Sequence, residues 1–380
     1  MDNLRYWLGF NVVRGIGPVR LRALIERFGD VRAAWEAPQS ALQEAKLDRR
    51  SLRNLLKARR QVDLDQLLRK VEVEGVQVFT WESADYPSLL WEIDDAPPVL
   101  FVKGTLTPAD EWAVAMVGTR KSTVYGKELA QRLAGDLARN EITVVSGLAR
   151  GIDGIAHRAA LVAGGRTLAV LGCGVDHIYP PEHRRLAQDI IANGALISDY
   201  PLGTPPEGKN FPPRNRIISG LSLGVVVIEA GERSGALITA DFAAEQGREV
   251  FALPGNVLSP ASKGCNRLLK DGAAVVTEVQ DILETLHLNQ VVEKKVARQL
   301  LPSNATETLI FENLSTTPTH VDALSREIDL PVETVSSTLV MMELKGLVRQ
   351  AGPMRYVSAH ESRVEYEITP AIAREDEGTA

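Results

Sequence analysis

The chain has 380 residues, of which 44% are hydrophobic and 24% charged, so it has the composition of a globular protein and a length that predicts two or three domains. The absence of a signal-like start and of an apolar run of membrane length leads us to expect a cytoplasmic protein with no membrane partner. The net charge of −6 argues against a general nucleic-acid binder, and two cysteines, Cys173 and Cys265, are too few for a disulfide framework or a metal cluster.

The charge is unevenly distributed along the chain. Residues 1–80 hold 15 Lys and Arg against 10 Asp and Glu, whereas residues 281–380 hold 9 against 16. Because the molecule as a whole repels a polyanion, a polyanion site in the central part requires a local concentration of cations.

Apolar residues recur at helical spacing in segments 4–10, 21–28 and 55–73, so we expect residues 1–80 to form a helical domain. Gly15-Ile16-Gly17-Pro18 resembles the hairpin of a helix-hairpin-helix or SAM-like unit, whose glycine amides can meet a phosphate. A helical unit that packs against protein is an equal alternative. Residues 81–111 contain Pro87, Pro97, Pro98 and Pro108 and are expected to be a connector that carries a strand at 99–102.

From residue 112 onward, apolar strands alternate with helical segments. We expect strands at 114–117, 142–145, 167–171, 195–198, 225–229, 250–253 and 274–276, and helices at 125–140, 156–163, 182–193 and 236–246. Near-continuous Val, Ile and Leu runs between helices are typical of a parallel sheet covered on both faces. The predicted fold class is α/β, an extended Rossmann-like, doubly wound, mostly parallel sheet, in a domain over residues 81–286.

The C-terminal part reads as a separate unit. Residues 287–305 are charged, without an apolar period, and are expected to be a linker. Three helical segments followed by a hairpin predict a winged-helix domain over residues 306–360, and residues 361–380 are expected to be a disordered tail.

In an open parallel sheet, ligands bind beyond the carboxyl ends of the strands. Gly118-Thr119-Arg120-Lys121-Ser122 follows the first strand, and its amides, hydroxyls and cations suit a phosphate, although a tight turn with solvated cations is the alternative. Ser146-Gly147-Leu148-Ala149 follows the second strand. We expect Asp153 to cap the next helix and His157 to be structural, with an acid–base role as its alternative.

The segment 208–216 carries the strongest signal for nucleic acid. It offers three cations, two amides and one ring, namely Lys209, Arg214 and Arg216, Asn210 and Asn215, and Phe211, before a helix predicted at 217–221. Guanidinium and ammonium groups bind phosphate, and an aromatic face stacks on an unpaired base. Local salt bridges are the alternative. Ser234 and Gly235, after a later strand, present amides at another helix start.

Motifs for other chemistries are absent from the sequence. It contains neither a phosphate-binding G-x-x-x-x-G-K-[ST] loop nor a G-x-G-x-x-G after a strand, and its histidines lack metal-ligand spacing. A nucleophile elbow is absent as well. We therefore expect no catalytic residues, no metal and no cofactor.

Several stretches in the order of the chain closely resemble the DprA (Smf) family, the DNA-processing proteins of bacterial natural transformation. They are Met116-Val117-Gly118-Thr119-Arg120, segment 144–153, Tyr179-Pro180-Pro181, segment 211–218, Glu229-Ala230, segment 234–239 and Pro254-Gly255. The resemblance implies a Rossmann-like homodimer without catalysis that binds single-stranded DNA and helps to load a RecA-type recombinase onto it. Carried over by motif, the DNA-binding residues are Gly118, Thr119, Arg120, Ser146, Gly147, Lys209, Phe211, Arg214, Asn215, Arg216 and Gly235.

The predicted recognition helix of the winged-helix domain, at 332–345, carries Glu333 and Glu343 against Lys345. Because neutralising DNA phosphates needs cations, we expect this surface to contact protein or to regulate rather than to read a major groove.

Two rival functions remain. Related Rossmann-like phosphoribohydrolases of the LOG type act on nucleotide monophosphates, but segment 229–240 lacks their paired glycines and their catalytic glutamate. The other rival is a recombinase-binding scaffold whose contact with DNA is incidental.

Overall fold

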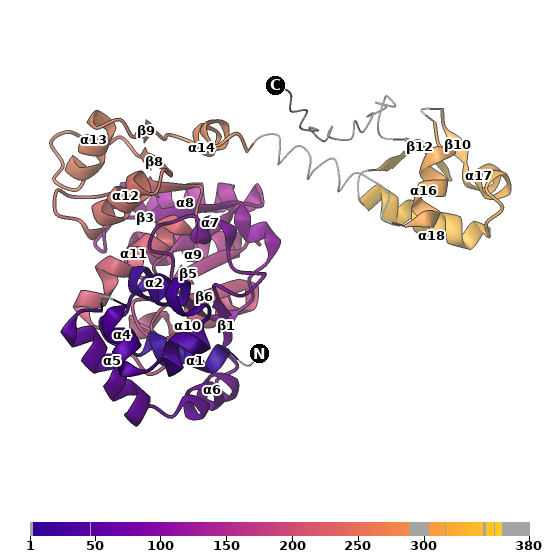
Figure 1. Cartoon of the computed structure of the whole chain (residues 1–380). Coiled ribbons are helices and arrows are strands. Elements are labelled where there is room, and N and C mark those ends of the chain that lie inside the picture. The colour runs from indigo at the N-terminus through magenta and orange to yellow at the C-terminus, as the bar shows by residue number, and fades with distance from the viewer. Residues whose placement is uncertain are drawn as a thin grey trace, which may run out of the picture. The chain divides into compact units, whose positions relative to one another are not determined.

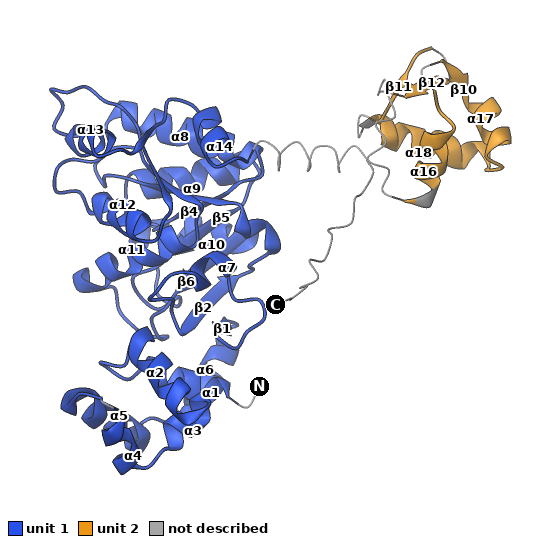
Figure 2. Ribbon diagram, turned by 45° about the horizontal axis from the view of Figure 1, so that its top comes forward, with its two compact units in different colours: residues 1–288 blue, residues 289–380 orange. Residues whose placement is uncertain are grey.

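The computed structural model describes residues 3–45, 47–288, 304–315, 317–344, 347–352 and 354–358. The chain divides into two compact units, Met1–Leu288 and Asn289–Ala380, which are treated separately below (Figure 2). Most of the linker predicted at 287–305 and all of the tail predicted at 361–380 lie outside the described residues. Among the described helices, none is long and apolar enough to cross a membrane.

Six helices open the first unit. They are α1 (Leu4–Asn11), α2 (Pro18–Phe28), α3 (Val31–Glu36), α4 (Gln39–Glu44), α5 (Arg49–Gln61) and α6 (Leu64–Val73). The side chains of Asp30, Asp48 and Asp63 accept hydrogen bonds from backbone amides at the starts of α3, α5 and α6, as N-cap residues do. The apolar faces of these helices share one core, whose largest members include Trp7 and Phe10.

The connector predicted at 81–111 contributes to the main sheet. Strand β2 (Val99–Gly104) pairs antiparallel with β1 (Gln77–Thr80) and with β6 (Gly194–Ser198). β1 lies at the end of residues 1–80, which were predicted to be helical, so the prediction was wrong for residues 77–80. Phe101 of β2 packs into the core of the N-terminal helices, which joins these helices to the sheet.

The main sheet has nine strands in the order β1-β2-β6-β5-β4-β3-β7-β8-β9. The seven strands β6-β5-β4-β3-β7-β8-β9, in their order across the sheet, are all parallel to their neighbours. The remaining strands are β3 (Ala113–Val117), β4 (Thr143–Ser146), β5 (Thr167–Val170), β7 (Gly224–Val227), β8 (Glu249–Ala252) and β9 (Ala274–Val275). Figure 1 shows the N-terminal helices at the end of the sheet that carries β1, and α13 (Lys263–Lys270) and α14 (Val279–Thr285) at the β9 end. The predicted doubly wound α/β fold is confirmed.

Helices cover both faces of this sheet. On one face, α9 (Ile152–Val162) packs between α8 (Val124–Arg139) and α10 (Arg184–Asn193). On the other face, α11 (Phe211–Gly220) packs against α12 (Gly235–Glu245) and against the short helix α7 (Ser88–Trp91). Alternate residues of β5 enter the two cores, since Ala169 packs with α10 and Val170 with α11 and α12. Burial on both faces explains the unbroken apolar runs of the sequence.

The strand order reverses between β3 and β7, because β4, β5 and β6 follow β3 on one side and β7 adjoins it on the other. The loops that leave β3 and β7 therefore diverge to opposite faces of the sheet, and a crevice opens at the carboxyl ends of these strands.

The second unit contains α16 (Ala305–Glu312), α17 (Val321–Glu327) and α18 (Val332–Leu344) and a small sheet in the order β10-β12-β11. Its strands are β10 (Thr319–His320), β11 (Val348–Gln350) and β12 (Arg355–Ser358). Residues from all three helices, including Ile310, Leu324 and Leu339, form a core of their own. Three helices with a β wing confirm the predicted winged helix.

Candidate nucleic-acid interface

A cavity of about 430 Å³ lies at the crevice between β3 and β7. Its walls come from the loop after β3, the first turn of α9, the first turns of α11 and the start of α12. The wall includes seven of the residues predicted to bind DNA: Gly118, Thr119, Arg120, Phe211, Arg214, Asn215 and Gly235. An eighth, Gly147, lines a small adjoining hollow together with Arg120, Tyr179 and Phe211.

The Phe211 ring is the centre of this arrangement. The guanidinium carbons of Arg120 and Arg214 lie 5.7 Å and 5.8 Å from its centroid, a spacing suited to cation–π attraction. The Tyr179 ring lies 5.6 Å from Phe211, tilted by 40°. The site therefore places a flat apolar face beside cationic groups.

Arg214 is a buried part of the wall, with only 4% of its surface exposed. Its Nη1 donates to the carbonyl oxygens of Gly147, at 3.0 Å, and of Val170, so the side chain holds the end of β4 against the end of β5. Burial lowers the pKa of the Arg214 guanidinium, and the Asp153 carboxylate opposes that shift. A Cβ on Gly147 would lie 2.7 Å from the Arg214 guanidinium, so glycine is required at this approach.

Asp153 organises the loop after β4. Its Oδ2 accepts hydrogen bonds from the amides of Gly147 and Ala149, at 3.2 Å and 3.3 Å. The prediction that Asp153 caps the helix was wrong, because α9 begins at Ile152 and its N-cap is Gly151, with a positive φ of 76°. Burial raises the pKa of the Asp153 carboxyl, and the Arg214 charge and the two amides oppose this shift.

Arg120 and Asn215 differ from Arg214 in their exposure. Arg120 is exposed, and no carboxylate of the described residues lies within ion-pair distance of it. Asn215 Nδ2 donates weakly to the carbonyl oxygen of Gly235, at 3.4 Å, and thereby links α11 to the start of α12. Both side chains keep hydrogen-bonding capacity for a ligand.

Three predicted residues do not line the cavity. Ser146 is fully buried, and its hydroxyl donates to the carbonyl oxygen of Met116 at 2.6 Å. Lys209 is exposed, and its Nζ lies 2.5 Å from Glu207 Oε2. Arg216 is buried, and it pairs with Asp199 at 2.7 Å and with Asp95 at 3.2 Å. The alternative of local salt bridges thus holds for Arg216 and Lys209.

The segment 208–216 is helical over most of its length, contrary to the prediction of a loop before a helix at 217–221. A 3-10 turn at Gly208–Asn210 leads directly into α11, which begins at Phe211. Pro212 and Pro213 occupy the first turn, where the absence of an amide hydrogen costs no helical hydrogen bond. Arg214, Asn215 and Arg216 therefore point in different directions around a helix.

His157 is structural. Its side chain is fully buried, its Nε2 accepts from the Leu148 amide at 3.3 Å, and its Nδ1 donates to Thr167 Oγ1 at 2.7 Å. The Thr167 hydroxyl donates in turn to the carbonyl oxygen of Val144. Burial lowers the pKa of His157 to about 3, so the ring is neutral and fully engaged, which removes the acid–base alternative.

Sequence reasoning missed Glu229 as a support of the site. Its carboxylate accepts hydrogen bonds from Thr123, from the amide at 2.9 Å and the hydroxyl at 2.8 Å, and its carbonyl oxygen accepts from the Thr119 amide at 2.8 Å. Thr123 in turn caps α8. Glu229 thus fixes both ends of the loop that carries Arg120. Its burial was hidden because an acidic residue after a strand normally reads as exposed.

The two cysteines, Cys173 and Cys265, are free and buried. Within the described residues, no group of three or more His, Cys, Asp or Glu side chains is placed to hold a metal ion.

Two family models match the chain. The model of DNA recombination-mediator protein A matches residues 77–287, and that of the DprA winged helix domain matches residues 294–352.

Among curated relatives, the Smf protein of Synechocystis sp. is 35% identical, and the match covers 92% of this chain and 98% of that protein. The Smf protein of Escherichia coli is 40% identical over 89% of this chain and 94% of its own length. Among solved structures, DNA processing protein A from Streptococcus pneumoniae superposes with a TM-score of 0.66 at 37% identity, covering 75% of this chain and 97% of that one. The Helicobacter pylori protein, whose structure addresses its single-stranded DNA binding mode, gives a TM-score of 0.51 at 32% identity, with 56% and 97% covered.

Proposed function

This chain belongs to the DprA (Smf) family of DNA recombination mediators, and on that premise we propose that its cavity binds single-stranded DNA without catalysing a reaction. The observation that carries the proposal is the pairing of exposed Arg120 with the Phe211 ring at one edge of the sheet. A strand of unpaired nucleotides presents both a phosphate for the guanidinium and a base for the ring.

The walls of the cavity suit a phosphate backbone. Ser234 caps α12 by accepting a hydrogen bond from the Ala236 amide, and this helix start lines the same cavity as Gly118 and Thr119. The helix dipole adds partial positive charge there. The Asp153 carboxylate is occupied by two amides and the nearby Arg214, so it shapes the loop and is not a free general base.

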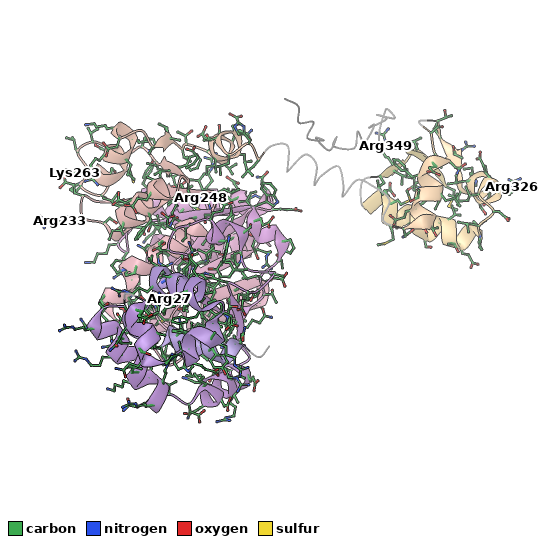
Figure 3. The ribbon with its side chains drawn as sticks, viewed as in Figure 1. Arg27, Arg233, Arg248, Lys263, Arg326 and Arg349 are labelled. Atoms are coloured by element: carbon green, nitrogen blue, oxygen red, sulfur yellow. The ribbon has the colours of Figure 1, made fainter. Side chains whose placement is uncertain are left out.

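We further propose, on the strength of family membership, that the chain acts as a homodimer and helps to load a RecA-type recombinase onto the bound strand. The winged-helix unit then serves contacts with protein. Its described basic residues are Arg326, Arg349 and Arg355, and Figure 3 shows Arg326 and Arg349 projecting from different sides of the unit. Val340 and Met341 on α18 are about half exposed, at 50% and 53%. The surface of α18 combines these apolar side chains with the acidic Glu333 and Glu343. It is therefore unsuited to binding a phosphate backbone.

Fluorescence anisotropy with a labelled oligothymidylate tests the DNA proposal. We expect R120A to weaken binding and to reduce the slope of log affinity against log salt by about 0.7, the value for one lost phosphate contact. We expect F211A to weaken binding by about 1–3 kcal/mol per stacked base, with an unchanged salt slope.

R132A is the matched control, because Arg132 lies on the exposed side of α8 and pairs with Asp136 at 3.9 Å. Binding by R120A and F211A that equals binding by R132A would overturn the proposal. A pull-down of recombinase with and without nuclease then tests whether the partner needs the bound strand.

A further inference from the structure

A second hollow of about 380 Å³ adjoins the cavity and is lined by cations. Arg120, Lys121 and Ser122 come from the loop after β3, Lys127 from the first turns of α8, and Arg158 from α9. Gly151 and Ile155 complete the wall. These cations come together because α8 and α9 pack against each other. No acidic residue lines this hollow.

Among the described residues, the cations of this hollow form no ion pair, unlike the two arginines further along α8, Arg132 and Arg139. Across residues 3–45 and 47–288, no carboxylate lies within ion-pair distance of Arg120, Lys121, Lys127 or Arg158. Other arginines of the same region are paired, namely Arg132 and Arg139 with Asp136, Arg150 with Glu182, and Arg166 with Asp110. A group of uncompensated cations in a chain of net charge −6 attracts an anion from outside.

The placement of Lys127 points the same way. It lies in the first turns of α8, where the helix dipole disfavours a positive charge. Its side chain is exposed and covers no core, so neither packing nor its own helix accounts for a cation there. An external polyanion does account for it.

Arg120 lines both the cavity and the second hollow, so the two adjoin through one side chain. We propose that the second hollow, with Lys121, Lys127 and Arg158, holds backbone phosphates of nucleotides that continue from those in the cavity. This proposal rests on the proposed function, since it extends the same strand. The hollow has no aromatic residue in its wall, so it contacts phosphates and does not select bases.

The double variant K127A/R158A tests the extension, with R132A/R139A as the control. Both variants remove two exposed positive charges from the face formed by α8 and α9, but the control arginines are paired with Asp136. Anisotropy is measured on a short oligothymidylate of about 4 nucleotides and a long one of about 20, lengths that span the usual range of single-strand sites. Thermal unfolding verifies that all variants are folded.

We expect K127A/R158A to lose affinity roughly tenfold for the long strand, with a salt slope smaller by about 1.4, the value for two phosphate contacts. Binding of the short strand stays at the parental level. Long-strand binding equal to that of R132A/R139A would refute the extension, and so would an equal loss on both lengths, which would assign the cations to the first cavity. Failure of the parent protein to bind either strand would instead refute the proposed function.

Discussion

Two arginines of the cavity wall, Arg214 and Arg120, differ in the burial of their guanidinium groups. Arg214 is buried, and its hydrogen bonds to Gly147 and Val170 join two strand ends, whereas Arg120 is exposed and free of carboxylates within residues 47–288. A buried guanidinium with its donors engaged stiffens the wall, and an exposed one keeps its donors for a ligand. Under the proposed function, Arg214 therefore positions the cavity wall and Arg120 contacts the strand.

The buried His157 ring makes the stability of the fold depend on pH. Its pKa is about 3 in the folded chain and 6.5 in the unfolded chain, so the unfolded state binds an extra proton between these values. The stability from the neutral ring is complete above about pH 6.5 and is lost as the pH falls toward 3. From pH 7.5 to pH 5 the loss amounts to about 2 kcal/mol.

Urea unfolding followed by tryptophan fluorescence measures this loss, because all five tryptophans lie within residues 1–288. We expect the stability difference between the parent and H157Q to shrink by about 2 kcal/mol over that pH range, since the variant has no group to protonate there. A constant difference at every pH would contradict the assignment of a neutral, buried ring.

At the scale of elements, α11 shows where sequence reasoning succeeds and fails. Strands β3 to β9 of the main sheet were predicted to within a few residues, since doubly buried strands leave long apolar runs. The start of α11 was missed because two prolines read as a loop, although they fit a first helical turn. β1 was missed because its pairing with β2 is a long-range contact that no local pattern encodes.

The same helix explains which site residues could be identified from sequence. Arg120 and Phe211 follow from local chemistry, as they flank strand and helix ends. Arg214 and Arg216 are two positions apart on a helix and point about 200° away from each other, so only one of them can face the cavity. The acidic partner of Arg216, Asp199, comes from the end of β6 and was invisible in the local sequence.

The ion pairs of Arg216 contribute to the stability of the first unit. Its ion pairs with Asp199 and Asp95 fasten α11 to the loops after β6 and α7. R216A leaves the largely buried Asp199 carboxylate without its cation, so we expect the free energy of unfolding to fall by about 3 kcal/mol. Urea unfolding measures the change, and K209A is its control, because Lys209 is an exposed cation of the same segment.

We expect R216A protein that remains folded to bind a single strand with the parental salt slope. A smaller salt slope together with an unchanged free energy of unfolding would indicate that Arg216 contacts DNA.

At the scale of the molecule, the two units differ in their net charge and in where their charged residues lie. Residues 289–380 hold 9 Lys and Arg against 14 Asp and Glu, so they carry most of the net negative charge. The first unit concentrates unpaired cations at one edge of its sheet. The net charge of the whole chain is therefore a poor guide to the electrostatic potential at this edge, because nearby charges outweigh distant ones at short range.

Removal of residues 289–380 tests this separation. Since each unit has its own core, we expect residues 1–288 to fold and to bind single-stranded DNA at least as tightly as the full chain. At low salt the shortened chain binds more tightly, because an acidic unit is gone, and the difference vanishes as salt screens it. Anisotropy at two salt concentrations measures both effects. Weaker binding by the shortened chain at both would show that the winged helix contacts DNA.

The reversal of strand order has a consequence for synthesis of the protein. The cavity wall draws on the loop at 118–120, the turn before α9, the first turns of α11 and the start of α12, which are separated by more than a hundred positions of chain. A nascent polypeptide lacks its last wall until α12 has left the ribosome and β7 has joined the sheet beside β3. The cavity proposed to hold the strand is thus completed only late in synthesis.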